Sequence, residues 1–178
     1  MNLPNKLSLT RIALIPVMVA LMYPNTTVCN LLAAAVFALA AFTDFLDGHI
    51  ARKQHIVTDF GKFVDPVADK LLVLSALIML IQQGLMLAWV VVVILARELC
   101  VDGLRMVAGS KGMVIAAGKL GKIKTCTQIL LILWLMLSRQ PVMGSIISGA
   151  LTLLVLVMTL WSGVEYFRNN RSVISTMK

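Results

Sequence analysis

The amino-acid sequence predicts an all-α integral membrane protein with six transmembrane helices and both termini in the cytoplasm. Of its 178 residues, 60% are hydrophobic and only 13% are charged, and the mean hydropathy is +0.93. Soluble domains are about 45–50% apolar and about 25% charged. Uncharged stretches of about 20 residues, the length that crosses a bilayer, also recur along the chain. This composition excludes a soluble domain, a disordered chain and, with three cysteines, a disulfide scaffold.

Turn signals divide the uncharged stretches into six predicted spans. The stretch 12–43 is too long for one helix and is interrupted at residues 23–25, which read Tyr-Pro-Asn. The stretch 71–96 is interrupted by Gln-Gln-Gly at residues 82–84. The predicted spans are residues 6–23, 29–47, 64–82, 87–108, 118–138 and 144–166. Because no repeat or linker separates them, we expect one membrane domain over residues 1–178.

The positive charges predict the orientation of these spans. The net charge is +8, and fifteen of the sixteen Lys and Arg residues lie on one side of the predicted topology, with only Arg139 on the other. Loops rich in Lys and Arg face the cytoplasm. We therefore expect a multi-pass protein of the plasma or inner membrane, with no nucleic-acid partner. A secretory signal is the alternative for the N-terminus, but no small-residue cleavage site follows it.

Four of the eight acidic residues flank the second connection and predict a metal site. Asp44 and Asp47 are three residues apart and Asp65 and Asp69 are four apart, so each pair shares a helix face. A charge deep in a span costs about 2.5–3.5 kcal/mol, and clustered carboxylates repel one another. Hard divalent cations such as Mg²⁺ bind carboxylates and substrate phosphates, and two such ions assist in-line phosphoryl displacement. The alternative is helix capping with ion pairs, because Asp65 precedes Pro66, a residue suited to a first helical turn.

The residues between these aspartate pairs suit a phosphate-containing ligand. Gly48 and Ala51 leave room beside the helix end, and Arg52 follows one helical turn after Gly48. Gly61 permits a tight turn before the third span, and Thr58 adds a hydroxyl to the loop.

The segment 44–69 reads DxxDGxxARx8GxxxDxxxD and resembles the signature of the CDP-alcohol phosphotransferase family. The fold of that family, with six spans and cytoplasmic termini, agrees with the topology above. Residues 4–11, 65–70, 96–98 and 121–125 further resemble bacterial members that use glycerol 3-phosphate as the acceptor alcohol. Ser8 departs from that subgroup, where threonine is usual, but it keeps the hydroxyl.

The resemblance implies transfer of a phosphatidyl group from CDP-diacylglycerol to sn-glycerol 3-phosphate, giving phosphatidylglycerophosphate and CMP in a cytoplasm-facing cleft. It also implies a homodimer and two Mg²⁺ ions, or Mn²⁺ in their place. Asp69 would be the general base as well as a metal ligand. The implied metal ligands are Asp44, Asp47, Asp65 and Asp69. The implied CDP-diacylglycerol-binding residues are Asn5, Ser8, Arg11, Gly48, Ala51, Arg52, Thr58 and Gly61.

An acceptor that carries a phosphate needs cations of its own. Arg97 and Arg105 are eight residues apart and lie within about 80° on a helical wheel. The predicted glycerol 3-phosphate-binding residues are Arg97, Arg105, Lys122 and Lys124. Pairing with Glu98 or Asp102 is the alternative for Arg105, and a topological or anionic-lipid role is the alternative for the two lysines.

Two other functions fit parts of the sequence. The acceptor could be serine, inositol or phosphatidylglycerol, although the cations around the fourth span favour a phosphorylated acceptor. Buried aspartates could also serve a cation or proton transporter. A transporter is expected to place charges near the midplane, often with inverted repeats, whereas these charges gather at one interface.

Overall fold

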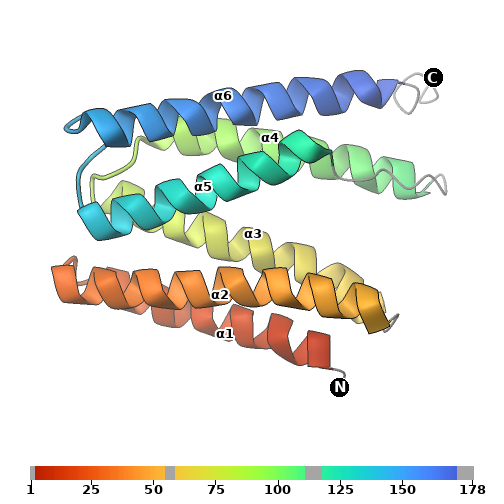
Figure 1. Ribbon diagram of the computed structural model, residues 1–178, viewed down its shortest axis with the longest axis horizontal. Helices are drawn as coiled ribbons and strands as arrows, with labels where there is room; N and C mark the ends of the chain where they lie inside the picture. The colour runs from red at the N-terminus through yellow and green to blue at the C-terminus, as the bar shows by residue number, and fades with distance from the viewer. Residues whose placement is uncertain (1–2, 55–58, 111–117, 172–178) are drawn as a thin grey trace. The chain divides into compact units, whose positions relative to one another are not determined.

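The structure is all-helical over the part of the chain that it describes. This computed structural model describes the backbone of residues 3–54, 59–110 and 118–171, and the side chains of residues 9–43, 67–109, 118 and 120–171. The helices are α1 (Leu3–Met22), α2 (Thr27–Gln54), α3 (Asp59–Gln82), α4 (Ala88–Ser110), α5 (Lys119–Ser138) and α6 (Ile146–Asn169) (Figure 1). The prediction of an all-α chain is confirmed for these residues.

The two helices that carry the aspartate motif are longer than predicted. The second predicted span ends at residue 47, but α2 continues to Gln54. The third predicted span begins at residue 64, but α3 begins at Asp59. Hydropathy identifies the apolar part of a helix, and residues 48–54 contain charged side chains but no proline, so the helix extends beyond its apolar part.

Backbone geometry ends the helices where the turn signals predicted. Asn25, between α1 and α2, has a positive φ of 52°. Gly84, after α3, has φ +73°, and the N–H groups of Gly84 and Leu85 donate to the carbonyls of Ile81 and Leu80, both at 2.9 Å. This pair of bonds is a Schellman cap, in which glycine adopts the left-handed conformation at least cost.

Arg139 ends α5 and also fixes the turn between α1 and α2. Its φ is 54°, and its N–H donates to the carbonyl of Leu135 at 3.1 Å. Its Nη2 donates to the carbonyl and the Oδ1 of Asn25 at 2.7 and 2.9 Å, and its Nη1 donates to Thr27 Oγ1 at 3.2 Å. The guanidinium therefore satisfies oxygen atoms of the turn that connects two neighbouring helices.

The chain divides into two compact units. The first contains residues 1–85 and 132–140, and in it α1 packs against α2 and α3, which also contact each other (Figure 1). Its core is formed by fully buried side chains that include Met18, Phe37, Leu72, Leu77 and Leu80.

A buried amide network joins the three helices of the first unit at one end. The side chain of Asn30 is completely buried, and its Nδ2 donates to Gln83 Oε1 at 3.3 Å. Gln83 Nε2 donates in return to Asn30 Oδ1 at 3.0 Å and to the carbonyl of Met22 at 2.7 Å. These bonds satisfy amides that would be costly to bury alone.

The second unit contains residues 86–131 and 141–178, and in it α4 packs against α6. Val101, Leu104 and Ala108 of α4 form a buried cluster with Tyr166 of α6, and Phe167 packs against it.

Much of the apolar surface is exposed, which supports association with a membrane. Within the described residues, Leu120–Ser138 and Ile146–Asn169 are long and apolar enough to cross a bilayer, while Leu9–Met22 and Thr27–Thr43 are shorter apolar helices. Every helix also exposes large apolar side chains, among them Val17, Leu39, Ile78, Val92, Leu130 and Leu153. Water-soluble monomers rarely expose contiguous apolar surface on this scale.

Candidate active site

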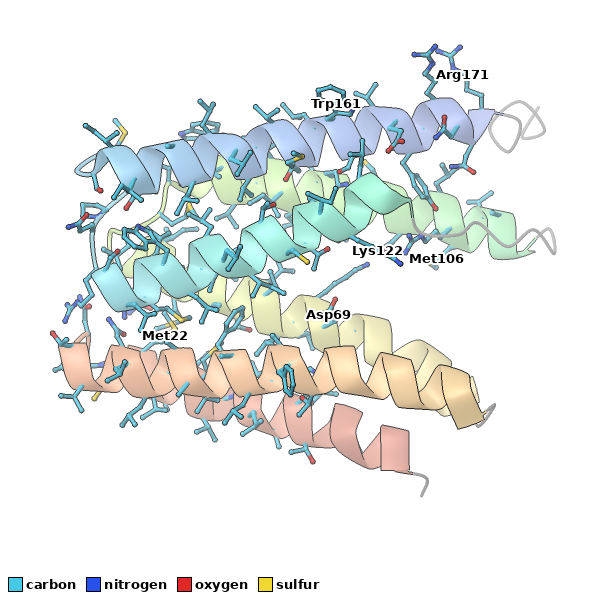
Figure 2. The ribbon with its side chains drawn as sticks, viewed as in Figure 1. Met22, Asp69, Met106, Lys122, Trp161 and Arg171 are labelled. Atoms are coloured by element: carbon cyan, nitrogen blue, oxygen red, sulfur yellow. The ribbon has the colours of Figure 1, made fainter. Side chains whose placement is uncertain are left out.

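The aspartate motif lies on two helices that contact each other. Asp44 and Asp47 belong to α2, and Asp65 and Asp69 belong to α3, so the spacing that places each pair on one helix face is present in the backbone. The side chain of Asp69 is half-buried on α3 (Figure 2). The side chains of the other three aspartates lie outside the described residues.

The structure corrects one prediction and removes one alternative for the connection between these helices. α3 begins at Asp59, so Asp65 and Pro66 lie inside the helix and Asp65 does not cap it. Gly61 also lies inside α3 rather than in a tight turn. The reason is the same for both: the helix starts before the apolar segment from which its start was predicted.

The remaining nucleotide-site residues fall on the first unit's helices. Gly48, Ala51 and Arg52 belong to α2, and Asn5 and Ser8 belong to α1, but their side chains lie outside the described residues, as does Thr58 altogether. Arg11 is described and is only 1% exposed on α1. A cation this deeply buried is rare unless it is paired or has a role in binding.

The donor set of the motif fits a divalent cation. Four carboxylates, two from each of two contacting helices, offer hard oxygen ligands of the kind that Mg²⁺ and Mn²⁺ prefer. Among the side chains that the structure describes, no three His, Cys, Asp or Glu residues gather to hold a metal, and of the four predicted ligands only Asp69 is in that set.

A second cluster of charges lies in the second unit, centred on Glu98 of α4. One oxygen, Glu98 Oε1, accepts from Arg97 Nη1 at 3.0 Å and from Lys124 Nζ of α5 at 2.5 Å. The side chains of Arg97, Glu98 and Lys124 are 13%, 22% and 4% exposed. Arg97 Nε is buried and has no hydrogen-bond partner among the described residues.

Two glycines flank the side chain of Arg97. A Cβ on Gly163 of α6 would lie 3.3 Å from Arg97 Cγ, which is a tight contact. A Cβ on Gly121 of α5 would lie 3.8 Å from Arg97 Nη2. The absence of a side chain at Gly163 therefore leaves room for the arginine stem, whereas a Cβ at Gly121 would make only an ordinary contact.

The other two predicted acceptor-binding residues have different surroundings. Arg105 Nε donates to Tyr166 Oη at 3.0 Å, and its guanidinium lies 5.4 Å from the centre of that ring. Lys122 is exposed on α5 (Figure 2). The structure therefore brings Arg97 and Lys124 together through Glu98, and among the described residues it pairs Arg105 with the ring of Tyr166.

Sequence reasoning treated Glu98 as an alternative partner for Arg105 and did not find its part in this cluster. The signal was present, because a carboxylate within an apolar stretch needs a cationic partner. The helical wheel of α4 alone could not show that the partner comes from α5.

Comparison with known proteins agrees with the resemblance found in the sequence. The sequence model of the CDP-alcohol phosphatidyltransferase family matches residues 1–161, and the chain belongs to that family. It is 46% identical to the CDP-diacylglycerol–glycerol-3-phosphate 3-phosphatidyltransferase of Bacillus subtilis (strain 168), over 98% of both chains. It is 38% identical to the protein of that name from Rickettsia typhi, over 94% of this chain and 96% of the relative. The Shigella flexneri serotype 5b protein of the same name is 36% identical over 96% of both chains.

Proposed function

We propose that this chain transfers the phosphatidyl group of CDP-diacylglycerol to sn-glycerol 3-phosphate, giving phosphatidylglycerophosphate and CMP. The observation that carries the proposal is the 46% identity to the Bacillus subtilis enzyme of that name over 98% of both chains. The intact DxxDG…DxxxD motif and the buried cations of the second unit support it.

In the proposed reaction, the C1 hydroxyl oxygen of glycerol 3-phosphate attacks the phosphorus that carries diacylglycerol. The bond from that phosphorus to the bridging oxygen breaks, and CMP leaves with the bonding electrons. The hydroxyl proton passes to the carboxylate of Asp69, which acts as the general base.

Asp44, Asp47, Asp65 and Asp69 are the proposed ligands of one or two divalent cations, Mg²⁺ or Mn²⁺. When bound, such ions neutralise the negative charge of the diphosphate and of the departing phosphate. Because each pair of these aspartates belongs to a single helix, α2 and α3 determine where this charge would be neutralised.

The proposed CDP-diacylglycerol-binding residues come from α1, α2, the following connection and α3. Arg11 supplies a buried cation from α1, which suits the diphosphate. Gly48, Ala51 and Gly61 have small or no side chains, so a ligand can approach the helix backbone. The full proposed set is Asn5, Ser8, Arg11, Gly48, Ala51, Arg52, Thr58 and Gly61.

For the acceptor, Arg97 and Lys124 are the proposed main contacts of the glycerol 3-phosphate phosphate, with Arg105 and Lys122 as outer cations. The support is the buried Nε of Arg97, which has a proton to donate and no acceptor among the described residues. A neutral alcohol would leave this donor unsatisfied.

The proposed setting is a single six-span domain over residues 1–178 in the plasma or inner membrane. Both termini and the reacting groups face the cytoplasm, and the protein forms a homodimer. The distribution of Lys and Arg supports the orientation. The diacyl chains of the substrate stay in the bilayer while its headgroup reacts at the cytoplasmic interface.

The proposal is tested by CMP release from the purified protein in detergent–lipid micelles that contain CDP-diacylglycerol and Mg²⁺. Glycerol 3-phosphate, serine, inositol and phosphatidylglycerol are offered one at a time. We expect release with glycerol 3-phosphate alone, and its loss when EDTA is added. Release with another alcohol would overturn the acceptor assignment, and no release with any acceptor from folded protein would overturn the reaction itself.

A further inference from the structure

We propose that Glu98 is a positioning residue that holds Arg97 and Lys124 together as one binding unit for the acceptor's phosphate. This inference rests on the proposed function and concerns how its acceptor site is built. Glu98 itself carries the same sign of charge as the substrate, so its role is to arrange the cations and not to contact the acceptor.

The first argument is the shared oxygen. Because Arg97 Nη1 and Lys124 Nζ lie 3.0 and 2.5 Å from the same Glu98 Oε1, these two nitrogens are at most 5.5 Å apart. Two cations this close repel each other, more strongly where they are buried. A carboxylate between them removes the repulsion and leaves the three-residue cluster with a net charge of +1.

The second argument is that the N–H groups of the Arg97 guanidinium differ in their hydrogen bonding. Nη1 is committed to Glu98, while Nε is buried and without a hydrogen-bond partner among the described residues. A guanidinium binds phosphate through two adjacent N–H groups, and the edge formed by Nε and Nη2 is such a pair. The bond to Glu98 therefore turns the guanidinium so that one complete edge is left for a phosphate.

The third argument is the fit of the arginine stem. Arg97 Cγ would lie 3.3 Å from a Cβ on Gly163, so α6 leaves this stem little spare room. Glu98 fixes the end of the side chain and Gly163 accommodates its base. The position of Arg97 is thus set at two separate points.

The test compares Glu98→Gln with wild type in the CMP-release assay. Glutamine keeps the size of the side chain but removes the charge that offsets the two cations. We expect the KM for glycerol 3-phosphate to rise at least tenfold, with kcat and the KM for CDP-diacylglycerol within about threefold of wild type. A merely structural defect would not confine its effect to one substrate.

Glu165→Gln is the matched control, because Glu165 is a half-buried glutamate of α6 in the same unit. It should leave both KM values unchanged. An unchanged or lowered KM for glycerol 3-phosphate in Glu98→Gln would overturn the proposal, since a carboxylate that merely opposed phosphate binding would give the lowered value.

Two further variants keep the result decisive. If Glu98→Gln does not fold, Gly163→Ala moves the Arg97 stem without removing a charge. It should raise the KM for glycerol 3-phosphate selectively, and an unchanged KM would overturn the positioning of Arg97.

Arg97→Ala separates the two proposals. No glycerol 3-phosphate-dependent release by wild type overturns the proposed function and the role of Glu98 with it. An active wild type whose KM rises in Arg97→Ala but not in Glu98→Gln overturns the role of Glu98 alone.

Discussion

At the scale of single residues, Asp69 combines two proposed roles in one half-buried side chain on α3. Asp69→Asn keeps the size of the side chain but can no longer accept the proton of the attacking hydroxyl. General-base catalysis contributes about 10²–10⁴-fold, so we expect kcat to fall by about that factor or more. Binding of CDP-diacylglycerol, measured by equilibrium titration in micelles, should be largely kept.

Asp59→Asn provides the comparison for this variant. Asp59 begins α3, ten residues before Asp69, and occupies one of the eight unspecified positions between Arg52 and Gly61 of the motif. Its replacement should leave kcat near the wild-type value. If Asp69→Asn retained activity within tenfold of wild type, Asp69 could not be the general base.

The residues of the candidate site could be predicted from the sequence to different extents. The shared helix face of each aspartate pair could be predicted, because both members lie on one helix and their spacing alone decides the face. The link between Arg97 and Lys124 could not be predicted, because it joins α4 to α5 through Glu98. Likewise, no spacing rule gives the contact of Arg105 with Tyr166, which are 61 residues apart.

At the scale of the helix, Gly84 is the position where backbone conformation should matter most. Its φ of +73° is unfavourable for residues with a Cβ, and nothing lies within 4 Å of where that Cβ would be. The effect of Gly84→Ala is therefore conformational and costs about 1–2 kcal/mol. For a chain of this size we expect the Tm in detergent to fall by about 2–8 °C in a thermal-shift measurement.

Gly103→Ala is the matched control, because Gly103 lies inside α4 and a Cβ added there would also meet nothing within 4 Å. There alanine favours the helix by about 0.5–1 kcal/mol, so the Tm should rise. Equal shifts in the two variants would contradict the assignment of a left-handed cap to Gly84.

The ends of the helices show what the sequence does and does not specify. The breaks after α1 and α3 were predicted because Pro24 with Asn25, and Gly84, mark a turn locally. The extension of α2 to Gln54 was missed because residues 48–54 are too polar to be counted as a membrane span. A helix can continue past the apolar layer, and here the missed part carries Gly48, Ala51 and Arg52 of the family signature.

At the scale of the whole molecule, the proposed six-span topology predicts that the two ends of α6 lie on opposite sides of the membrane. In a background without Cys29, Cys100 and Cys126, a single cysteine is placed at exposed Gln140 or at exposed Asn169. A membrane-impermeant maleimide should label Gln140→Cys in intact cells. It should label Asn169→Cys only after the membrane is permeabilised.

The cysteine-free protein serves as the background control, and labelling in detergent checks that both positions react. Labelling of Asn169→Cys in intact cells would contradict a cytoplasmic C-terminus. Labelling of both variants from the same side would contradict an odd number of crossings between them.

The hydrogen-bonded side chains of Asn30 and Gln83 set the axial alignment of α2 with α3, and this alignment extends to the other end of the first unit. α2 and α3 are antiparallel there, and the pair fixes one against the other along their axes. Asp44 lies fourteen residues after Asn30, and Asp69 lies fourteen residues before Gln83. At about 1.5 Å per residue, both aspartates stand about 21 Å from the pair. Asp47 and Asp65, at seventeen and eighteen residues, stand about 26 and 27 Å away. Measured from this amide pair, the backbone positions of Asp44 and Asp69 stand at the same distance along their helices, and those of Asp47 and Asp65 at nearly the same distance.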